Sequence, residues 1–486
     1  MNTDANPEPQ AQDSKPHLKA KTVIPVVPAG LDEELYAIRK KIYPRAASGI
    51  FATWRWILVW ATQLIFFGLC WMQWNGRQAL LFDLAERKFY IFGLVFWPQD
   101  VFFLAVLLIV CAYSLFLFTA VAGRLWCGYA CPQTVYTEIF LWIESKIEGD
   151  HVRRMKLDAQ PFSARKLGLK LAKYGAWVLF SVWTGISFAG YFTPIRELLP
   201  SIFTGQLGGW QIFWICFYSG FTYLMAGVMR EQVCKYMCPY ARFQGVMFDP
   251  DTLVITYDTQ RGEPRGPRRK GSDYKANSLG DCVDCGICVQ VCPTGIDIRK
   301  GLQYECIGCA ACIDGCDQVM EKMNYPKGLI RYSTEHALEQ GWGTKEILGH
   351  VLRPRTLIYS SVLCLIIIGF VWGIASRIPV RMDVIRDRGT LAREVEDGMI
   401  ENVYSLRVMN ASEAAREVKI SVTGIDGIKL LGDTVASIGP NDARTLSVRA
   451  RIPGDAVPRG SHKIFFDLHT ADNKIALHEK STFLMQ

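Results

Sequence analysis

The chain has 486 residues, of which 50% are hydrophobic and 21% charged, with 54 lysines and arginines against 46 aspartates and glutamates. This composition is too apolar for a disordered or purely soluble protein. The apolar residues are concentrated in a few long runs, which indicates a membrane protein with soluble parts. The 16 cysteines are too sparse for a small disulfide scaffold, so their spacing has to decide their role.

Five runs are long and apolar enough to cross a bilayer as helices, because a hydrocarbon core of about 30 Å needs roughly 20 apolar residues. They are residues 56–74, 101–121, 173–192, 210–229 and 356–374. Tryptophan and tyrosine at their ends fit the headgroup region. Five buried helices of a soluble protein would be an unusual alternative. Residues 89–97 are too short to span, and we expect them to lie in the interface or to re-enter it.

Lysine and arginine set the expected orientation, because basic loops stay on the inner side of the membrane. They are abundant before the first run and after the second, and sparse after the first and third. We therefore predict a multi-pass protein of the bacterial inner membrane, with a cytoplasmic N-terminus, a cytoplasmic 230–355 segment and a periplasmic C-terminal domain. The first 50 residues are polar and show no cleavable signal peptide, so the first span is expected to direct insertion.

Eight cysteines fall into two matching groups, CVDCGICVQVCP and CIGCAACIDGC. Each reads C-x2-C-x2-C-x3-C, the spacing of bacterial two-cluster ferredoxins, in which the fourth cysteine of each group binds the other cluster. One [4Fe–4S] cluster is therefore assigned to Cys282, Cys285, Cys288 and Cys316, and the second to Cys306, Cys309, Cys312 and Cys292. Zinc sites usually use C-x2-C pairs, and disulfides do not suit a cytoplasmic loop.

Glycines and prolines near these cysteines carry further expectations. Gly286, Gly295, Gly308 and Gly315 are expected in tight turns where a Cβ would clash. Cys292 is followed by Pro293, as is usual in ferredoxins. Cys316 is followed by Asp317 instead, so the pattern does not predict the backbone conformation there.

Two further cysteine pairs, Cys127 with Cys131 and Cys234 with Cys238, follow the second and fourth runs. Both read C-x3-C-P, and the motif recurs at equivalent places in what resembles a duplicated two-span unit. Spacing of i, i+4 predicts two thiols on one face of a helical turn that the proline ends. The four thiols are candidate catalytic residues that could converge on copper, on another metal centre or as a redox-active dithiol. A purely structural role at helix ends is the alternative.

The other cysteines, Cys70, Cys111, Cys216 and Cys364, occur one per run, and core packing is the default expectation for them. Copper handling by Cys70 with Met72 is the rival interpretation. None of the seven histidines lies inside a span, which argues against haem held by two histidines in the membrane.

The soluble segments differ in character. Residues 258–278 are basic and rich in glycine and proline, which indicates a linker near anionic lipid, and no aromatic or fold signal supports nucleic-acid binding. After residue 377, NVYSLRVMN, EVKISVTG, RTLSVRARI, HKIFFDLHT and ALHEKSTFLM alternate as strands do, with turn formers between them. They predict an immunoglobulin-like β-sandwich without its disulfide.

The expected fold is thus a polytopic α-helical membrane protein of five transmembrane helices with a cytoplasmic ferredoxin-like domain and a C-terminal immunoglobulin-like domain. The predicted divisions are a disordered cytoplasmic N-terminus (1–35), a four-helix membrane domain (36–257), the basic linker (258–278), the two-cluster domain (279–330), a connector (331–355), the fifth helix (356–376) and the periplasmic domain (377–486).

Taken together, these motifs resemble the FixG/CcoG/RdxA group of membrane iron–sulfur accessory proteins for cytochrome c oxidase. The resemblance covers nearly the whole chain from about Tyr36, including KFYIFGLVFWPQD, both C-x3-C-P motifs, the Cys316-Asp317 ending and NYPKGLIRYST. It implies a role in the maturation of cbb3-type oxidase, with reduction of Cu(II) to Cu(I). The implied partners are the membrane and the oxidase or its copper-handling assembly factors; a homo-oligomer is left open.

Together, the residues and the resemblance leave three functions open. No G-x-G-x-x-G phosphate cradle is visible, so a leading hypothesis of a cupric reductase needs an external electron donor. One alternative is an electron-transfer subunit that feeds a quinol or periplasmic reductase. The other is a non-catalytic scaffold for oxidase assembly.

Overall fold

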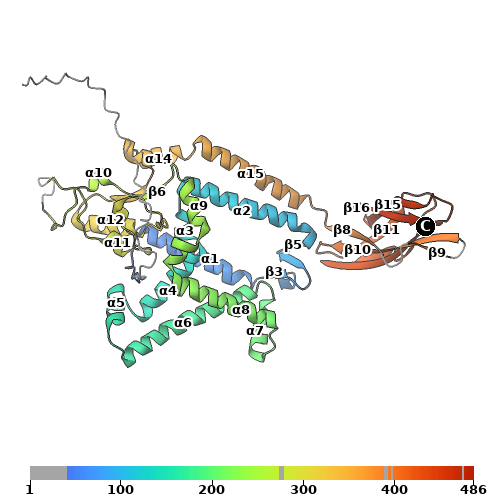
Figure 1. Cartoon of the computed structure of the whole chain (residues 1–486), viewed down its shortest axis with the longest axis horizontal. Helices are drawn as coiled ribbons and strands as arrows, with labels where there is room; N and C mark the ends of the chain where they lie inside the picture. The colour runs from blue at the N-terminus through green and yellow to red at the C-terminus, as the bar shows by residue number, and fades with distance from the viewer. Residues whose placement is uncertain (1–40, 273–277, 388–391, 396–397, 473–474, 486) are drawn as a thin grey trace, which may run out of the picture. The chain divides into compact units, whose positions relative to one another are not determined.

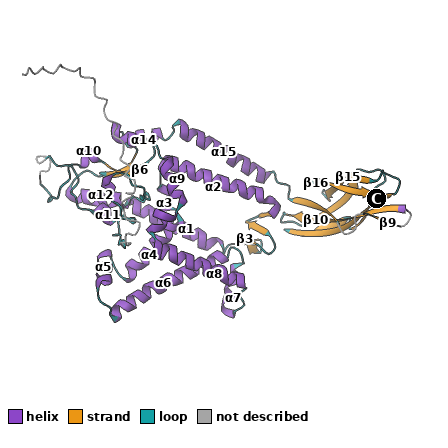
Figure 2. Ribbon diagram, viewed as in Figure 1, coloured by secondary structure: helices purple, strands orange, loops and turns teal. Residues whose placement is uncertain are grey.

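The computed structural model describes residues 41–272, 278–387, 392–395, 398–472 and 475–485. The predicted disordered segment 1–35 lies outside these residues. The chain divides into two compact units. The first unit comprises Met1–Arg55, Phe118–Gly128 and Glu231–Thr356, and the second comprises Trp56–Leu117, Tyr129–Arg230 and Leu357–Gln486. Figures 1 and 2 show that helices dominate the chain up to α15, whereas strands make up the segment after it.

Within the described residues, four helical stretches are long and apolar enough to cross a membrane. They are Ile50–Leu69 (α1), Pro98–Ala122, Gly209–Met229 and Pro354–Ala375 (α15). The second stretch consists of η1 (Pro98–Asp100) and α2 (Val101–Ala122), and the third consists of α8 (Gly209–Thr222) and the π-helix η2 (Tyr223–Met229). They correspond to four of the five predicted runs. The remaining run, 173–192, begins inside α6 (Ala164–Ala189), whose 26 residues are long enough but whose sequence includes Lys166, Lys170 and Lys173.

The structure corrects the end of the first predicted run and gives the fold of the segment 89–97. Helix α1 ends at Leu69, and residues up to 74 belong to the hairpin β1 (Gln73–Trp74) and β2 (Arg77–Gln78). The segment 89–97 is not a helix. It supplies most of β4 (Lys88–Ile91) and all of β5 (Leu94–Phe96), which form an antiparallel sheet with β3 (Leu80–Asp83). Aromatic and aliphatic residues with short turns between them favour strands here.

Helices α2 and α15 lie side by side in the second unit (Figure 1). The rings of Phe103 and Phe370 are 6.3 Å apart, and those of Tyr113 and Tyr359 are 6.1 Å apart. The buried Asp100, next to the start of α2, forms ion pairs with Arg377 and Arg381, which follow α15. The two helices are therefore tied both by ring contacts along their length and by charges at one end.

Further helices of the second unit are α4 (Pro132–Ile147), α5 (His151–Ala159), α6 and α7 (Ile195–Thr204). Helix α6 approaches α8 closely at Gly185, where a Cβ would lie 2.6 Å from the carbonyl oxygen of Ile215. Small residues at such crossings let membrane helices pack backbone to backbone.

The first unit holds the ferredoxin-like segment. Its strands β6 (Val254–Tyr257) and β7 (Ile330–Ser333) pair in antiparallel fashion, and around them lie α9 (Pro239–Met247), α10 (Thr259–Gly262), α11 (Ile287–Gln290), η4 (Ile298–Lys300), α12 (Ala311–Met323), α13 (Glu335–Gln340) and α14 (Thr344–His350). The predicted basic linker is partly folded onto this segment. Arg261 forms an ion pair with Asp281, and Arg268 donates to the carbonyl oxygen of Gly280.

The C-terminal strands form two antiparallel sheets around one core. One sheet has the order β12-β14-β10-β8, with β9 also paired to β10, and the other has the order β13-β11-β15-β16. Tyr404, Leu446, Phe466 and Phe483 from both sheets are fully buried between them. The strands are β8 (Val380–Arg386), β9 (Arg393–Val395), β10 (Met399–Asn410), β11 (Arg416–Thr423), β12 (Lys429–Gly432), β13 (Val435–Ile438), β14 (Asp442–Pro453), β15 (Gly460–Thr470) and β16 (Ala476–Met485). The five predicted strands are confirmed, and four shorter ones were missed.

Candidate functional site

The cluster cysteines lie in loops and at the starts of two helices in the first unit. Cys288 is in α11, and Cys312 and Cys316 are in α12. Gly286, Gly295 and Gly308 have φ values of 65°, 72° and 70°, so the expectation of tight turns is confirmed for them. It is wrong for Gly315, which is helical. A Cβ there would lie 3.3 Å from the side chain of Val291, so close packing of α12 against that residue explains the glycine.

The electrostatic neighbours of the thiols fall into two sets. Cys316 is influenced by Cys282, Cys285 and Cys288. Cys312 is influenced most strongly by Cys309, Cys306 and Cys292, and more weakly by Cys288. Cys292, Cys306, Cys309 and Cys312 also line one small cavity with Cys288 and several isoleucines. The grouping is the one expected of two clusters whose fourth ligands are exchanged.

Burial raises the pKa of the Cys288 thiol to about 11 and the pKa values of Cys306 and Cys316 to about 12. Repulsion from the neighbouring thiolates adds to this effect, and the pKa of Cys312 is also raised well above its usual value. Thiols placed in this way stay protonated unless positive charge is bound among them, which iron provides. The residues present therefore fit iron–sulfur clusters.

Among the described residues, no three histidine, cysteine, aspartate or glutamate side chains lie close enough together to hold one metal ion. A cube of four irons takes its thiolates at separate corners, so the cluster cysteines need not meet that condition. The C-x3-C-P thiols were expected to be able to converge on a single ion, and within the described residues they do not form such a site.

The backbone after Cys316 explains why Asp317 stands where ferredoxins usually have a proline. Helix α12 continues through Asp317 to Met323, where a proline would have interrupted it. The Asp317 carboxylate accepts a hydrogen bond of 2.9 Å from the amide of Gly328. Aspartate therefore takes part in holding the segment after α12, and the helix places Cys316 on its first turns.

The first C-x3-C-P motif lies against the loop of the second cysteine group. Its first cysteine, Cys127, is in α3 (Leu125–Tyr129), and a Cβ on the neighbouring Gly128 would lie 2.7 Å from Cys309 Cα. The backbone of α3 therefore touches the backbone around Cys309. Cys127 Sγ and the amide of Gln244 are 3.4 Å apart.

Arg124 stabilises the contact between α3 and the loop of the second cysteine group. This side chain is 7% exposed, and its guanidinium donates to the carbonyl oxygens of Tyr304, Cys306 and Ala241. The guanidinium also lies 4.7 Å from the centre of the Tyr304 ring. A buried cation beside Cys306 favours negative charge there, and Arg124 lowers the pKa of Cys306 against the stronger effect of burial.

The helical geometry predicted for both C-x3-C-P motifs is wrong at the second cysteine. Cys131 is the N-cap of α4, and Cys238 is the N-cap of α9, each with extended backbone and with the proline as first helical residue. Proline suits that position because the first turn needs no amide donor, so it begins the next helix and does not merely end the previous one. Cys234 lies in a π-turn, η3 (Val233–Met237).

Cys127 and Cys234 nevertheless come together in one apolar cluster of the first unit. Both contact the buried core formed by Val291, Ile307, Cys309 and Ala311, as does Cys312. One thiol from each C-x3-C-P motif thus lies with thiols of the second cysteine group. Cys131 belongs to the second unit, where Gln133, two residues further on, donates to the carbonyl oxygens of Met225 and Arg230.

Of the four cysteines outside these motifs, one is buried and three are exposed. Cys70 is fully buried among apolar residues, which confirms the packing expectation, while Met72 is 46% exposed. For Cys111, Cys216 and Cys364 the expectation of core packing is wrong, since all three are exposed on their helices. A lipid-facing position needs only an apolar side chain, which a free cysteine provides.

Three residues important to this site were not identified from the sequence. Arg124 and Gln244 hold the first C-x3-C-P motif, and Asp314 accepts hydrogen bonds from the amides of Phe51 and Ala52 at the start of α1. A signal existed for Arg124, because GRLWC places a lone arginine at the apolar end of α2. None existed for Asp314, whose partners lie more than 260 residues away in the sequence.

Comparison with protein families agrees with this geometry. A family described as "4Fe-4S dicluster domain" matches residues 229–335, and one described as "4Fe-4S binding domain" matches residues 104–149. The "IG-like fold at C-terminal of FixG" family, whose description classes FixG as a candidate oxidoreductase, matches residues 370–486. The two iron–sulfur matches include both C-x3-C-P motifs.

Relatives match along most of their length. The nitrogen fixation protein FixG of Rhizobium meliloti is 37% identical over 445 residues, covering 85% of this chain and 84% of that protein. Protein RdxB of Cereibacter sphaeroides is 38% identical over 426 residues, covering 85% and 89%. The crystal structure of a FixG-related protein from Vibrio parahaemolyticus covers 23% of this chain and 99% of that chain at 25% identity, with a TM-score of 0.21. The chain is a multi-pass membrane protein, and it belongs to the FixG/RdxA/RdxB family of membrane iron–sulfur electron-transfer proteins.

Proposed function

We propose that this protein is an oxidoreductase that reduces Cu(II) to Cu(I) during maturation of a cbb3-type cytochrome c oxidase. One observation carries the proposal: Cys127 and Cys234 contact the same apolar core as Cys309 and Cys312. Thiols suited to soft Cu(I) therefore lie next to thiols suited to an iron–sulfur cluster. The resemblance to the oxidase accessory proteins points to the same activity.

We assign one [4Fe–4S] cluster to Cys282, Cys285, Cys288 and Cys316, and the second to Cys292, Cys306, Cys309 and Cys312. Bound clusters supply one-electron transfer. The chain contributes the buried thiols, the left-handed turns at three glycines and the Arg124 cation beside Cys306. The grouping of electrostatic neighbours around Cys312 and Cys316 supports this division.

Cys127 and Cys234, one thiol from each C-x3-C-P motif, are the proposed copper-binding thiols. Cys131 and Cys238, at the N-caps of α4 and α9, are further proposed catalytic residues of the same motifs. Thiolates prefer Cu(I) to Cu(II), so they stabilise the product of the reduction. Each Cu(II) ion takes one electron and becomes Cu(I), without proton transfer. The electron comes from an external donor.

We propose five spans, with α6 as the third. Two of its charges are neutralised inside the second unit. The Lys173 amine, 1% exposed, lies 3.1 Å from a carboxylate oxygen of Glu148 and 3.6 Å from one of Glu144. Lys170 pairs with Glu148 and Asp158 at 2.7 and 2.6 Å. Paired charges lower the cost of placing this helix in a bilayer.

Five spans place the N-terminus in the cytoplasm and the C-terminal domain in the periplasm of the inner membrane. Four spans would place both termini on one side. A membrane-impermeant thiol reagent applied to intact spheroplasts tests this, with one cysteine introduced at the exposed Glu417 of the C-terminal domain in a background without reactive native cysteines. Labelling only after lysis would contradict the five-span topology.

The C-terminal domain is the proposed contact with the oxidase or its copper-handling assembly factors. Immunoglobulin-like sandwiches bind partners more often than they catalyse reactions. The fold carries no cysteine after residue 377, so its stability rests on the apolar core between the two sheets.

Copper reduction can be measured directly on the purified protein. The anaerobic protein, reduced with dithionite and freed of excess reductant, is mixed with Cu(II) and a Cu(I)-specific chelator. Cu(I) should form in proportion to the electrons stored. Serine at Cys127 or Cys234 should slow its formation while the iron content is retained. Serine at Cys111, an exposed cysteine of α2, is the matched control.

The two other functions give different results. A scaffold should still support oxidase assembly after Cys285 and Cys309 are replaced by serine, whereas an electron carrier should not. A subunit that feeds another reductase should lose no function in vivo when Cys127 and Cys234 are replaced, provided that the clusters remain. Reduced protein that leaves Cu(II) unchanged would refute the cupric reductase.

A further inference from the structure

The two cysteine groups of the first unit differ in their exposure to water. Of the eight cluster cysteines, all of which the structure describes, Cys285 is the exposed one. Cys309 is buried in the core that Cys127, Cys234 and Cys312 also contact. The proposed site therefore has one end open to water, at Cys285, and one end enclosed by the chain, next to the proposed copper-binding thiols.

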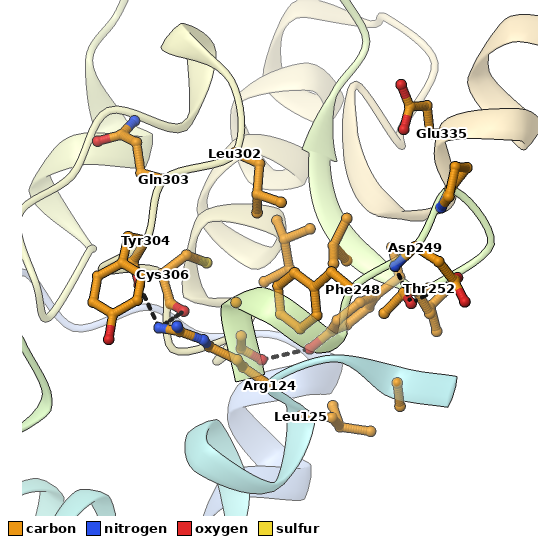
Figure 3. A pocket seen from close by; sticks show the side chains of 18 of the residues that line it. Arg124, Leu125, Phe248, Asp249, Thr252, Leu302, Gln303, Tyr304, Cys306 and Glu335 are labelled. Atoms are coloured by element: carbon orange, nitrogen blue, oxygen red, sulfur yellow. Dashed lines mark hydrogen bonds between the residues drawn. The ribbon is translucent and has the colours of Figure 1, made fainter. Parts of the chain in front are cut away.

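The enclosed end uses its cation internally. Figure 3 shows the Arg124 side chain extending towards Tyr304 and Cys306. Arg124 is 7% exposed, and its guanidinium donates to the carbonyl oxygens of Tyr304, Cys306 and Ala241. A cation that is covered and bonded in this way does not attract a charged partner from solution. An approaching protein therefore meets charge at the open end.

A basic segment, residues 261–270, runs beside the loop of the first cysteine group. The amide of Gly280 donates to the carbonyl oxygen of Pro264 at 2.9 Å, and the amide of Gly266 donates to that of Cys282 at 3.3 Å. The charged residues of the segment are one carboxylate, Glu263, and five cations, Arg261, Arg265, Arg268, Arg269 and Lys270. Backbone hydrogen bonds thus hold a strongly basic segment next to Cys282, a proposed ligand of the first cluster.

Three of the five cations face water. Arg265, Arg269 and Lys270 are exposed, whereas the other two are bound to acceptors within the first unit. The guanidinium of Arg265 lies 3.5 Å from the Glu263 carboxylate. An exposed pair of this kind contributes little stability, so its cation is available to a partner that brings more negative charge.

Charged side chains also reach the residue before Cys285. Arg299 forms ion pairs with Asp284 and Asp297 at 2.5 and 2.7 Å. Hydrogen bonds from Arg299 lower the pKa of Asp297, and the charge of Arg265 adds to this effect. Arg265, Asp297 and Arg299 therefore lie near one another and near Asp284. Because Arg299 is balanced by two carboxylates, the excess positive charge comes from the basic segment.

We propose that a small acidic protein carrying a one-electron redox centre docks at the exposed edge around Cys285, with its carboxylates against Arg265, Arg269 and Lys270. Electron-transfer proteins make small, short-lived contacts, in which complementary charge raises the rate of encounter. The carrier is oxidised by one electron, which the cluster held by Cys285 takes up. No bond forms and no proton moves in this step.

The inference deepens the proposed function, on which it rests, by naming the class of the external electron donor and the direction of transfer. Electrons enter at Cys285 and leave next to Cys309, where Cys127 and Cys234 lie. Anionic lipid headgroups are the other acidic surface that a basic segment can meet. The protein carrier is favoured, because this segment is hydrogen-bonded to the cluster loop on the side where a cluster ligand is open to water.

The test mixes the oxidised holoprotein with a reduced plant-type [2Fe–2S] ferredoxin, a small acidic protein, and follows cluster reduction by stopped-flow absorbance without copper. The second-order rate constant should fall steeply as salt is added, because ions screen the attraction. Arg265→Glu and Arg269→Glu should each lower it about threefold to tenfold at low salt, and much less at about 0.5 M salt. Lys345→Glu, the same change of charge at an exposed lysine of α14, should leave it unchanged.

A reductant without charge separates docking from damage to the clusters. Photoreduced 5-deazariboflavin should reduce both variants at the parent rate, and both should retain the iron content of the parent. If one variant loses iron, Lys270→Glu takes its place, since Lys270 is also exposed.

Parent-like rates with ferredoxin in variants of full iron content would overturn the proposal. The same rates together with weaker contact to a headgroup-labelled anionic lipid in nanodiscs would assign the basic segment to the bilayer. Charge-dependent reduction by ferredoxin with failed copper reduction would refute only the proposed function. Copper reduction by dithionite-reduced protein, with a ferredoxin rate that the variants do not change, would refute only this inference.

Discussion

Replacing Gly128 by alanine should separate the first C-x3-C-P motif from the second cluster. The added Cβ would lie 2.7 Å from Cys309 Cα, 2.8 Å from Cys309 N and 2.9 Å from the carbonyl carbon of Gly308. Favourable contacts between such atoms lie at about 3.5–4.0 Å. All three neighbours are backbone atoms of the cluster loop, so no side chain can rotate to relieve the overlap.

The expected magnitude is the balance of two effects. Overpacking of this kind costs about 1–3 kcal/mol. Alanine in place of glycine favours a helix by about 1 kcal/mol, which opposes that cost in α3. The balance is a net loss of about 0–2 kcal/mol, and we expect the upper half of this range because the backbone atoms that meet the Cβ cannot rotate away. A loss of about 1–2 kcal/mol corresponds to a factor of roughly 5–30 in the equilibrium constant for docking of α3. Electron transfer to Cu(II) bound at Cys127 should fall by a similar factor.

The assay is the rate of Cu(I) formation by the reduced protein, read with a Cu(I)-specific chelator, together with the EPR signals of both clusters. Gly128→Ala should slow Cu(I) formation at least about fivefold and perturb only one of the two EPR signals. Gly349→Ala, in a helix of the same unit with nothing within 4 Å, should retain the parent rate. A parent-like rate and unchanged signals in Gly128→Ala, at full iron content, would refute close docking of α3 on the cluster loop.

Two further predictions concern charge. Arg124→Met removes a buried cation beside Cys306 and should lower the reduction potential of one cluster by on the order of 50–100 mV in an EPR-monitored titration. Arg242→Met, which removes an exposed cation, should leave that potential unchanged. Equal shifts in both variants would argue against a specific effect of Arg124 on the cluster. In the C-terminal domain, hydrogen bonds from Arg451 and Arg393 outweigh burial and lower the pKa of Glu401 from 4.5. Because its folded pKa is depressed, this carboxylate stabilises the domain above about pH 4.5, and the stabilisation is lost as the pH falls through the folded pKa. Glu401→Gln should destabilise the domain by about 1–3 kcal/mol near neutral pH and remove this acid dependence in urea-dependent proteolysis; a stability equal to the parent at pH 7 would contradict it.

Local sequence patterns were sufficient for much of this protein. Long apolar runs predicted four helices that could cross a membrane, because the thickness of a bilayer sets a length and composition that few other segments meet. Alternation of apolar residues predicted five strands of the C-terminal domain. The four missed strands, β8, β9, β12 and β13, have three to seven residues, too few for a period of two to stand out.

The sequence predicted part of the candidate site correctly and part of it wrongly. Eight cysteines at fixed spacings predicted two clusters, since three ligands of each cluster lie within seven residues. The C-x3-C-P spacing predicted one helical turn, and this was wrong, because proline at Pro132 and Pro239 favours the first position of a new helix.

Tertiary structure alone decided the contacts between distant segments. Arg124 lies 117 to 182 residues before the carbonyl oxygens that it binds. Asp314 caps a helix that begins 264 residues earlier. Lys173 has its charge neutralised by Glu144 in α4 and by Glu148, the C-cap of α4. Spacing along the chain specifies a helix, a strand or a cluster loop, because those depend on near neighbours. It does not specify which buried charge meets which acceptor, because that depends on how the elements pack.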